Sequence, residues 1–341
     1  MASIKDIAAA CGVSVATVSK ALNGQPDISD STRARVLEKV KAMGYTPNSS
    51  ARALKTSRSH NLGILLADEA GNGLTQEFFA ALLEAFRKQA ESSGYDITFI
   101  HRRSGTQRRS YLEHCRYRCV DGVFVACAGV DFSDPGVVEL VTSDLPVITV
   151  DHIFNDRSAV LSDNVDGPQQ LVDYLCSLGH RRIAFIHGEA GASVTQKRLA
   201  GYYRACAAHG IEPPDAYVRG SAYRDPARCA EETRALLALA ERPTAILFPD
   251  DLSAIGGMEG IRKEGLLIPR DISVAGYDGI LLTRVITPQL TTWCQNTDEL
   301  GRVAAIRLIQ QIEHPRVTLP EQQVISGRLQ TGESCAPPPK P

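Results

Sequence analysis

The sequence lacks the features of a membrane or exported protein. Among its 341 residues, no stretch approaches the roughly 18 continuous apolar residues of a membrane-spanning helix. The N-terminus also lacks the charged segment followed by an apolar one that marks an export signal. The composition, 43% hydrophobic and 22% charged, is that of an ordinary globular protein. We therefore expect a cytoplasmic protein with no membrane partner, and the chain length suggests two or three domains.

Signatures of catalytic and nucleotide-binding loops are missing as well. Gly71-Asn-Gly73 has neither the complete G-x-G-x-x-G pattern nor the lysine of a phosphate-binding loop. Neither a G-x-S-x-G nucleophile elbow nor an H-E-x-x-H zinc motif occurs. These absences do not exclude an enzyme, but no residue pattern indicates one. We expect a protein that is not an enzyme and needs no cofactor.

Metal-site spacing is also absent from the nine scattered cysteines. Only Cys115 and Cys119 lie close together, and no second cysteine pair or histidine cluster accompanies them, as a zinc site would require. Most of the cysteines are better interpreted as small buried hydrophobic residues in a reducing compartment. We therefore expect no metal site.

Three short helices are predicted within residues 1–60. The first follows Ser3, which forms a capping-box pattern with Asp6, and its apolar stripe has helical spacing: Ile4, Ile7, Ala8 and Cys11. The third can start at Ser29 and run to Met43. Gly44 then fits the left-handed position that closes a helix.

The second helix is central because its two faces differ. Ser14 is a natural N-cap, and Gly12-Val13 before it forms a turn short enough to let two helices cross. At about 100° per residue, one side carries the apolar residues Val18, Ala21 and Leu22. The other side offers a methyl, a hydroxyl and a cation, namely Ala16, Ser19 and Lys20, with Val15 at its edge. One face can pack while the other contacts a partner, as in a helix-turn-helix.

Charge separates this N-terminal segment from the rest of the chain. Residues 1–60 hold nine Lys and Arg against four Asp and Glu, so their net charge is +5. The whole chain carries −2, which leaves −7 on the other 281 residues. A small basic head on an acidic body suits a local surface for DNA phosphates.

A run of sequence matches at fixed spacing lies in residues 4–8, 12–20, 22–23, 32–33, 44–45, 47–48 and 51–54. In these segments the sequence resembles the LacI/GalR family of bacterial transcription repressors. The resemblance implies an all-α helix-turn-helix head over residues 1–47 and a hinge helix with linker over 48–60. The alternative from periodicity alone is a generic three-helix module.

The resemblance also implies which side chains meet DNA. In this family the second helix enters the major groove, and the hinge helix, here about residues 49–56, lies in the minor groove. The leucine matched by Leu54 enters the central base step, which costs unstacking but opens a surface for further contacts. The family often has Arg where this chain has Lys20. The implied DNA-binding residues are Ser14, Val15, Ala16, Thr17, Ser19, Lys20, Asn23, Asn48, Ala51, Arg52 and Leu54.

From Leu62 onward, apolar strands alternate with helices, the pattern of parallel sheets covered on both faces. The first series has candidate strands at residues 62–66, 97–100, 122–126 and 146–150, with helices at 76–92 and 108–117. The second has strands at 159–162, 182–187, 217–219, 245–248 and 272–275, with helices at 167–178, 195–209, 226–240 and 251–264. One more helix (295–313) and one last strand (324–328) follow. The repetition predicts two similar α/β lobes.

The body, residues 61–335, resembles the same family. Its matches lie in residues 178–183, 198–202, 243–245, 251–254, 271–278 and 288–292. The resemblance implies two doubly wound lobes of the periplasmic-binding-protein type, with a ligand between them. Crossover segments are expected near 151–159, 291–295 and 318–322, after which the last helix returns to the first lobe. We expect residues 336–341 to form a disordered tail and, since no C-terminal leucine heptad is present, the protein to be a homodimer.

Candidate effector-binding residues follow from strand ends and from the resemblance. Ligands of α/β lobes bind at the carboxyl ends of strands. Asp151, Asp250 and Asp278 each follow an apolar strand, although an Asp in this position is often only a helix N-cap. Arg198 opens the family's Arg-Leu-x-Gly motif, and Asp250 stands where the family often has Asn. The further candidates are Phe78, His152, Tyr223 and Gln295.

The resulting hypothesis is a repressor that binds a pseudo-palindromic operator and is controlled by a small molecule. Carboxylates accept from pairs of sugar hydroxyls and an Arg fork donates to sugar oxygens, so we expect a sugar or sugar derivative. A purine or nucleoside effector is the alternative within this class. A sugar-binding protein without a regulatory role is the alternative outside it.

Overall fold

The computed structural model describes residues 2–46, 58–66, 73–104, 107–126 and 133–339. The chain divides into two compact units, a head (Met1–His60) and a body (Asn61–Pro341). Within the described residues, no helix is both long enough and apolar enough to cross a membrane.

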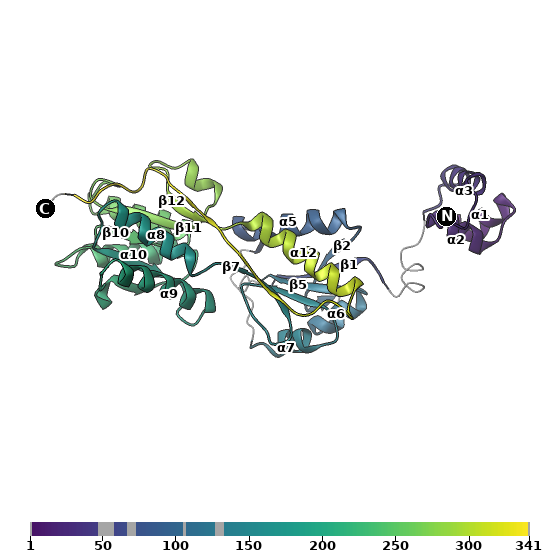
Figure 1. Cartoon of the computed structure of the whole chain (residues 1–341), viewed down its shortest axis with the longest axis horizontal. Helices are drawn as coiled ribbons and strands as arrows, with labels where there is room; N and C mark the ends of the chain where they lie inside the picture. Colours follow the sequence, from purple (N-terminus) through teal and green to yellow (C-terminus); the bar gives the residue numbers. More distant parts are fainter. Residues whose placement is uncertain (1, 47–57, 67–72, 105–106, 127–132, 340–341) are drawn as a thin grey trace. The chain divides into compact units, whose positions relative to one another are not determined.

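The head consists of three helices, α1 (Ile4–Cys11), α2 (Val15–Leu22) and α3 (Asp30–Ala42) (Figure 1). Serine hydroxyls cap all three by accepting a backbone N–H of the first turn, from Ser3, Ser14 and Ser29. Gly12 and Gly44 close α1 and α3 with left-handed φ values of 63° and 57°. The core is formed by Ile7, Ala8, Cys11, Val18, Ala21 and Val36. These features confirm the predicted helices, whereas the expected hinge helix lies outside the described residues.

The first lobe of the body is built on a six-stranded parallel sheet in the order β13-β7-β6-β5-β1-β2. Its strands are β1 (Asn61–Leu66), β2 (Asp96–Phe99), β5 (Gly122–Ala126), β6 (Val147–Val150), β7 (Ser158–Ser162) and β13 (Gln322–Ile325). The helices α5 (Glu77–Ser92) and α12 (Thr297–Glu313) lie side by side on one face (Figure 1). At their crossing Gly301 is required, because a Cβ there would lie 2.3 Å from the Leu82 carbonyl oxygen. The helices α6 (Tyr111–Tyr117) and α7 (Pro135–Thr142) cover the other face.

The second lobe has a six-stranded sheet in the order β14-β12-β11-β10-β8-β9, in which only the β12–β14 pair is antiparallel. Its strands are β8 (Ile183–His187), β9 (Val218–Gly220), β10 (Ala245–Leu247), β11 (Ser273–Asp278), β12 (Thr291–Cys294) and β14 (Arg328–Gln330). One face is covered by α8 (Asp166–Ser177) and α9 (Ser193–Ala208). The other is covered by α10 (Pro226–Leu237) and α11 (Asp251–Lys263). The predicted two-lobed α/β body is therefore confirmed.

The crossovers differ from the prediction in two places. The strand predicted at 159–162 is β7, which pairs with β6 in the first sheet, so the chain first changes lobe at 163–165 rather than 151–159. Parallel neighbours are usually joined by a dozen or more residues, and the loop between β6 and β7 is shorter, which made it look like a crossover. The second crossover, 295–296, lies at the edge of the expected range. The third is 326–327 rather than 318–322, because the single strand predicted at 324–328 is two strands, β13 and β14.

Four further segments differ from the prediction. The segment expected to cross at 291–295 is mostly strand β12, and helix α7 was not anticipated. A short hairpin, β3 (Arg103–Ser104) and β4 (Gln107–Arg108), precedes α6 and shortens that helix. The predicted disordered tail does not begin at Ala336, whose carbonyl oxygen is 2.9 Å from His180 Nε2 and accepts from the Ser273 hydroxyl at 3.1 Å.

Candidate functional site

The exposed face of α2 carries the side chains predicted for the major groove. Val15 is 40% exposed, Ala16 is also exposed, and Ser19 and Lys20 are half-buried at the margin of this face. The other predicted residues of the helix are held locally: the Thr17 and Ser14 hydroxyls share a 2.8 Å hydrogen bond, and the exposed Asn23 donates to the Ser19 carbonyl oxygen at 2.7 Å. The predicted DNA contacts Asn48, Ala51, Arg52 and Leu54 lie outside the described residues.

An ion pair on this face was not predicted. Lys20 Nζ contacts a carboxylate oxygen of Asp27, in the turn between α2 and α3. The hydrogen bond from Lys20 lowers the pKa of Asp27, and both side chains remain about half exposed to water. Because Asp27 lies seven residues beyond Lys20 and outside α2, helical spacing gave no signal for this pair. The amine that we expect to read a base therefore already has a carboxylate partner in the free head.

In the body, Arg198 is the centre of a buried polar cluster. It projects from α9 with 5% of its surface exposed. Its Nε donates to Asn164 Oδ1 at 2.9 Å and its Nη1 to the Pro249 carbonyl oxygen at 2.7 Å. The guanidinium carbon lies 3.6 Å from the Tyr277 ring centroid, a cation–π contact that suits the flat arginine head. These contacts fix the guanidinium in one orientation.

Asp151 joins this cluster from the first lobe. At the end of β6 it adopts a left-handed φ of 57°, which is costly outside glycine. Its carboxylate accepts from the Ser162 backbone and hydroxyl at 2.7 and 3.0 Å and from Asn164 Nδ2 at 3.2 Å. Burial raises its pKa, while the Ser162 hydrogen bonds and the positive charge of Arg198 oppose that rise. Asn164, in the first crossover, therefore bridges Asp151 of one lobe and Arg198 of the other.

Asp278 lies at the end of β11 with an equally unusual φ of 115°. Gln295 Nε2 donates to it at 2.7 Å. Burial raises the pKa of Asp278 to about 7, and the neighbouring Asp250 adds to the rise that Arg198 opposes. Among the described residues, the Tyr277 hydroxyl and Gln295 Oε1 are buried without a hydrogen-bond partner. Buried polar atoms of this kind usually have a partner, so these two are available to a ligand or to water.

The adjacent acids Asp250 and Asp251 have different local roles. Asp250 caps α11, accepting from the Ser253 backbone and hydroxyl at 2.9 Å each, and it also accepts from the Arg224 backbone at 2.7 Å. Asp251 is fully buried and accepts from the backbone of the loop after β11 and from a β12 hydroxyl. Burial raises its pKa well above the usual value. Asp250 is thus the helix cap, and its carboxylate is already occupied by protein donors.

Of the remaining candidates, Tyr223 lies at this cluster, while His152 and Phe78 pack against neighbouring aromatic rings. Tyr223 shares a 2.8 Å hydrogen bond with Thr195, and Arg198 lies 5.5 Å from its ring centroid. The His152 ring packs on Phe154 at 4.7 Å, and burial lowers the pKa of His152. Phe78 is half-buried and meets Phe79 edge-on at 5.0 Å.

The structure therefore brings Asp151, Arg198, Tyr223, Asp278 and Gln295 together, with Asp250 beside them. Sequence reasoning missed Asn164 and Tyr277, which complete the cluster. Asn164 follows strand β7 and lies in the first crossover. It was missed because the prediction placed that crossover at 151–159. No group of His, Cys, Asp or Glu suited to a metal occurs in the described part of the chain.

Comparisons with known proteins agree with this architecture. Residues 3–48 match the family "Bacterial regulatory proteins, lacI family", and residues 172–335 match "Periplasmic binding protein-like domain". The chain is 32% identical over 318 residues to the ribose operon repressor of Haemophilus influenzae, covering 92% of this chain and 93% of that protein.

Two solved structures resemble the whole chain. The lac repressor dimer bound to operator and the anti-inducer ONPF is 25% identical, with a TM-score of 0.79 over 98% of this chain and 99% of that chain. The complex of the transcriptional regulator CelR with cellobiose is 26% identical, with a TM-score of 0.70 over 98% of this chain and 100% of that chain. The chain belongs to the lacI family of bacterial regulatory proteins, and it is a DNA-binding transcriptional repressor.

Proposed function

We propose that this repressor binds a pseudo-palindromic operator as a homodimer and that a sugar or sugar derivative in the Arg198 cluster controls it. The observation that carries the effector part is the buried chain Asp151–Asn164–Arg198 beside Asp278. Carboxylates and an oriented guanidinium bind sugar hydroxyls and ring oxygens. The unpartnered Tyr277 hydroxyl and Gln295 Oε1 add a donor and an acceptor.

Control of DNA binding would follow from the presence of two crossover residues in the proposed effector site. Asn164 belongs to the first crossover and Gln295 to the second. A ligand that binds better when the lobes are closed would shift the population toward that state. Closure in both subunits would change the distance between the two hinge segments and hence the fit of the two heads to DNA.

A homodimer is supported by exposed apolar side chains around the 3₁₀ turn η3 (Leu281–Arg284). Leu281 is 64% exposed, Leu282 38% and Val285 68%. Leu252, in the first turn of α11, is 38% exposed. The preceding Asp251 accepts from the Gly279 and Ile280 backbone, which holds this turn beside the η3 segment. A second copy that covered this surface would bury it, and two-fold symmetry would present two heads to two half-sites.

One experiment on the full chain tests the effector assignment. Thermal unfolding is followed with panels of neutral sugars, sugar acids, sugar phosphates and nucleobases. A ligand at 100 times its Kd should add about 2.7 kcal/mol of stability. The same compound must then change the affinity for operator fragments. Stabilisation by nucleobases alone would refute the sugar assignment in favour of a purine-type effector.

The dimer is tested separately by Val285→Asp, with Val317→Asp as control, since Val317 is also an exposed valine, 79% accessible, outside this surface. We expect only Val285→Asp to shift sedimentation toward the monomer and to weaken operator binding. Dimers that persist equally in both variants would show that η3 is not the interface.

A further inference from the structure

Arg224, in the loop before α10, has an unusual backbone conformation. Its φ is 56°, in the left-handed region that non-glycine residues rarely occupy. Its backbone N–H donates to Asp250 Oδ2 at 2.7 Å, which ties the loop to the cap of α11. Strained residues of this kind persist where the surrounding structure fixes them, and they concentrate at ligand sites. The backbone of Arg224 is therefore held beside the Arg198 cluster.

Its side chain extends from the second lobe to the first. The guanidinium carbon lies 5.9 Å from the ring centroid of Phe79, which belongs to α5. The charge is also close enough to Asp278 to lower that carboxyl's pKa, although burial outweighs this effect. Arg224 thus stands between the lobes, at the margin of the site proposed for the effector.

The donors of the two arginines are used differently. Arg198 directs Nε and Nη1 to fixed protein acceptors, and Asp151 and Asp278 balance its charge. Arg224 Nε is buried and has no hydrogen-bond partner in the described part of the chain. The adjacent Asp250 carboxylate already accepts three hydrogen bonds, from Ser253 and from the Arg224 backbone. The structure therefore holds a second guanidinium with an unused donor between the lobes.

We infer that the effector is an acidic sugar-like molecule, whose carboxylate or phosphate pairs with Arg224 next to Phe79. This inference rests on the proposed function and narrows its ligand class. A neutral polyol would engage the carboxylates and Arg198 but would not give the unused Arg224 Nε donor an anionic acceptor between the closed lobes. An anionic group accepts from the guanidinium in the parallel, charge-assisted geometry that arginine favours.

The test compares neutral sugars with anionic derivatives of the same sugars. Calorimetry on the full-length repressor measures glucose, galactose and ribose against the matching uronic or aldonic acids and the terminal phosphates, with inorganic phosphate as the probe for the anion alone. We expect at least one acid or phosphate to bind tenfold or more tightly than its neutral parent. Equal or weaker binding of every anionic member would overturn the inference and leave the sugar site intact.

Substitutions of Arg224 test whether this residue causes the preference for anionic ligands. Arg224→Gln should lower affinity for the anionic ligand at least tenfold and leave affinity for its neutral parent unchanged, and Arg224→Lys should lose less. Arg228→Gln is the matched control, because Arg228 lies four residues away, has a side chain 55% exposed and pairs with the buried Glu232 of α10. Unfolding of each ligand-free variant checks that it is folded. An anionic preference that survives Arg224→Gln would refute the role of Arg224, whereas failure of every sugar, acid and phosphate to bind would refute the sugar effector itself.

Discussion

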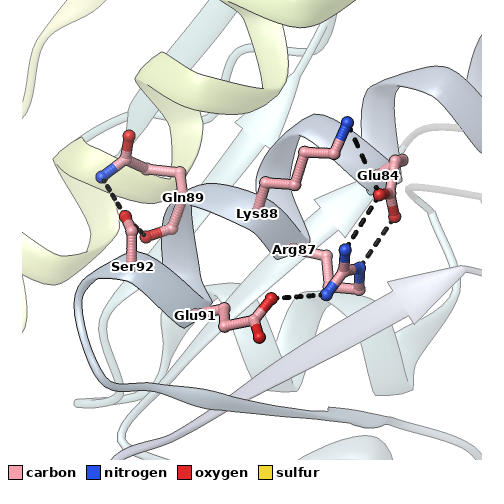
Figure 2. Close-up of polar contacts among 6 residues, drawn as sticks. All are labelled: Glu84, Arg87, Lys88, Gln89, Glu91 and Ser92. Atoms are coloured by element: carbon pink, nitrogen blue, oxygen red, sulfur yellow. Dashed lines mark hydrogen bonds and ion pairs between the residues drawn. The ribbon is translucent and has the colours of Figure 1, made fainter.

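Arg87 on α5 and Arg198 on α9 both make several polar contacts, yet their surroundings differ. Figure 2 shows Arg87 between Glu84 and Glu91, donating to the first at 2.7 and 2.9 Å and to the second at 2.7 Å, with Lys88 also beside Glu84. The Arg87 side chain is 42% exposed, whereas Arg198 is 5% exposed. The contacts of Arg87 are as short as those of Arg198.

Burial decides how much each arginine contributes. Hydrogen bonds from Arg87 lower the pKa of Glu84 to about 2, but water solvates both groups equally well when they separate, so an exposed pair adds little to stability. Removing a buried guanidinium leaves its carboxylate neighbours without a counter-charge in a medium that solvates them poorly. The number of polar contacts that an arginine makes is therefore a poor guide to its contribution. A better guide is whether its partners become solvated or stay buried when the arginine is removed.

The largest effect should come from Arg198→Gln. Asn164 would lose its donor, and Asp151 and Asp278 would lose their nearby cation. We expect the free energy of unfolding to fall by about 3–5 kcal/mol in urea denaturation. The effector response should disappear at a temperature at which the variant remains folded. Unchanged effector affinity in calorimetry would remove Arg198 from the site.

The next effect is a pH dependence due to Asp278. Its folded-state pKa of about 7 lies above the usual 3.8, so the folded protein holds this proton more tightly than the unfolded chain. The contribution of Asp278 to stability should therefore be complete below about pH 4 and decline as the pH rises to about 7. Asp278→Asn should flatten this part of the stability profile relative to wild type. Parallel profiles for the two proteins would show that Asp278 titrates normally.

The Lys20–Asp27 ion pair is exposed, and we expect Lys20 to contribute to DNA binding rather than to stability. Lys20→Ala should weaken the best operator by about 1–3 kcal/mol and relax the preference at one base pair per half-site, with little change in the unfolding midpoint. Asp27→Asn removes the competing carboxylate and should strengthen binding to all DNA sequences. A loss of affinity that is the same for every sequence in the Lys20 variant would identify a phosphate contact only.

The smallest effect should come from Arg87→Gln. Both glutamates become solvated when the pair is lost, so we expect no measurable change in the urea midpoint or in effector affinity. The comparison with Arg198→Gln, which makes the same side-chain change at a buried position, isolates burial as the variable. A large destabilisation by Arg87→Gln would contradict this interpretation.

Local features of the fold could be predicted because their causes are local. Ser14 and Gly44 sit where short-range hydrogen bonding and backbone freedom dictate a helix boundary. The first crossover at 163–165 could not be predicted. Whether β7 belongs to the first or the second sheet depends on partners such as β13, which is distant in sequence.

The site shows the same division. Asp151 and Asp278 were found because they follow apolar strands, whereas Asn164 was hidden by the misplaced crossover. Arg224 lies in an irregular loop, and only its position opposite Phe79 reveals it.

The bridge through Asn164 has a consequence for how such a repressor can change over evolution. This side chain contacts Asp151 and Arg198, two of the charged partners of the proposed ligand, and it is also part of the first crossover, about which the lobes would turn. In the proposed mechanism, effector recognition and lobe closure then depend on the same side chain. A substitution that adapts the cluster to a new effector alters the open–closed equilibrium in the same step. New specificities in this chain should therefore arise together with altered basal repression, and compensating changes should occur in the crossovers.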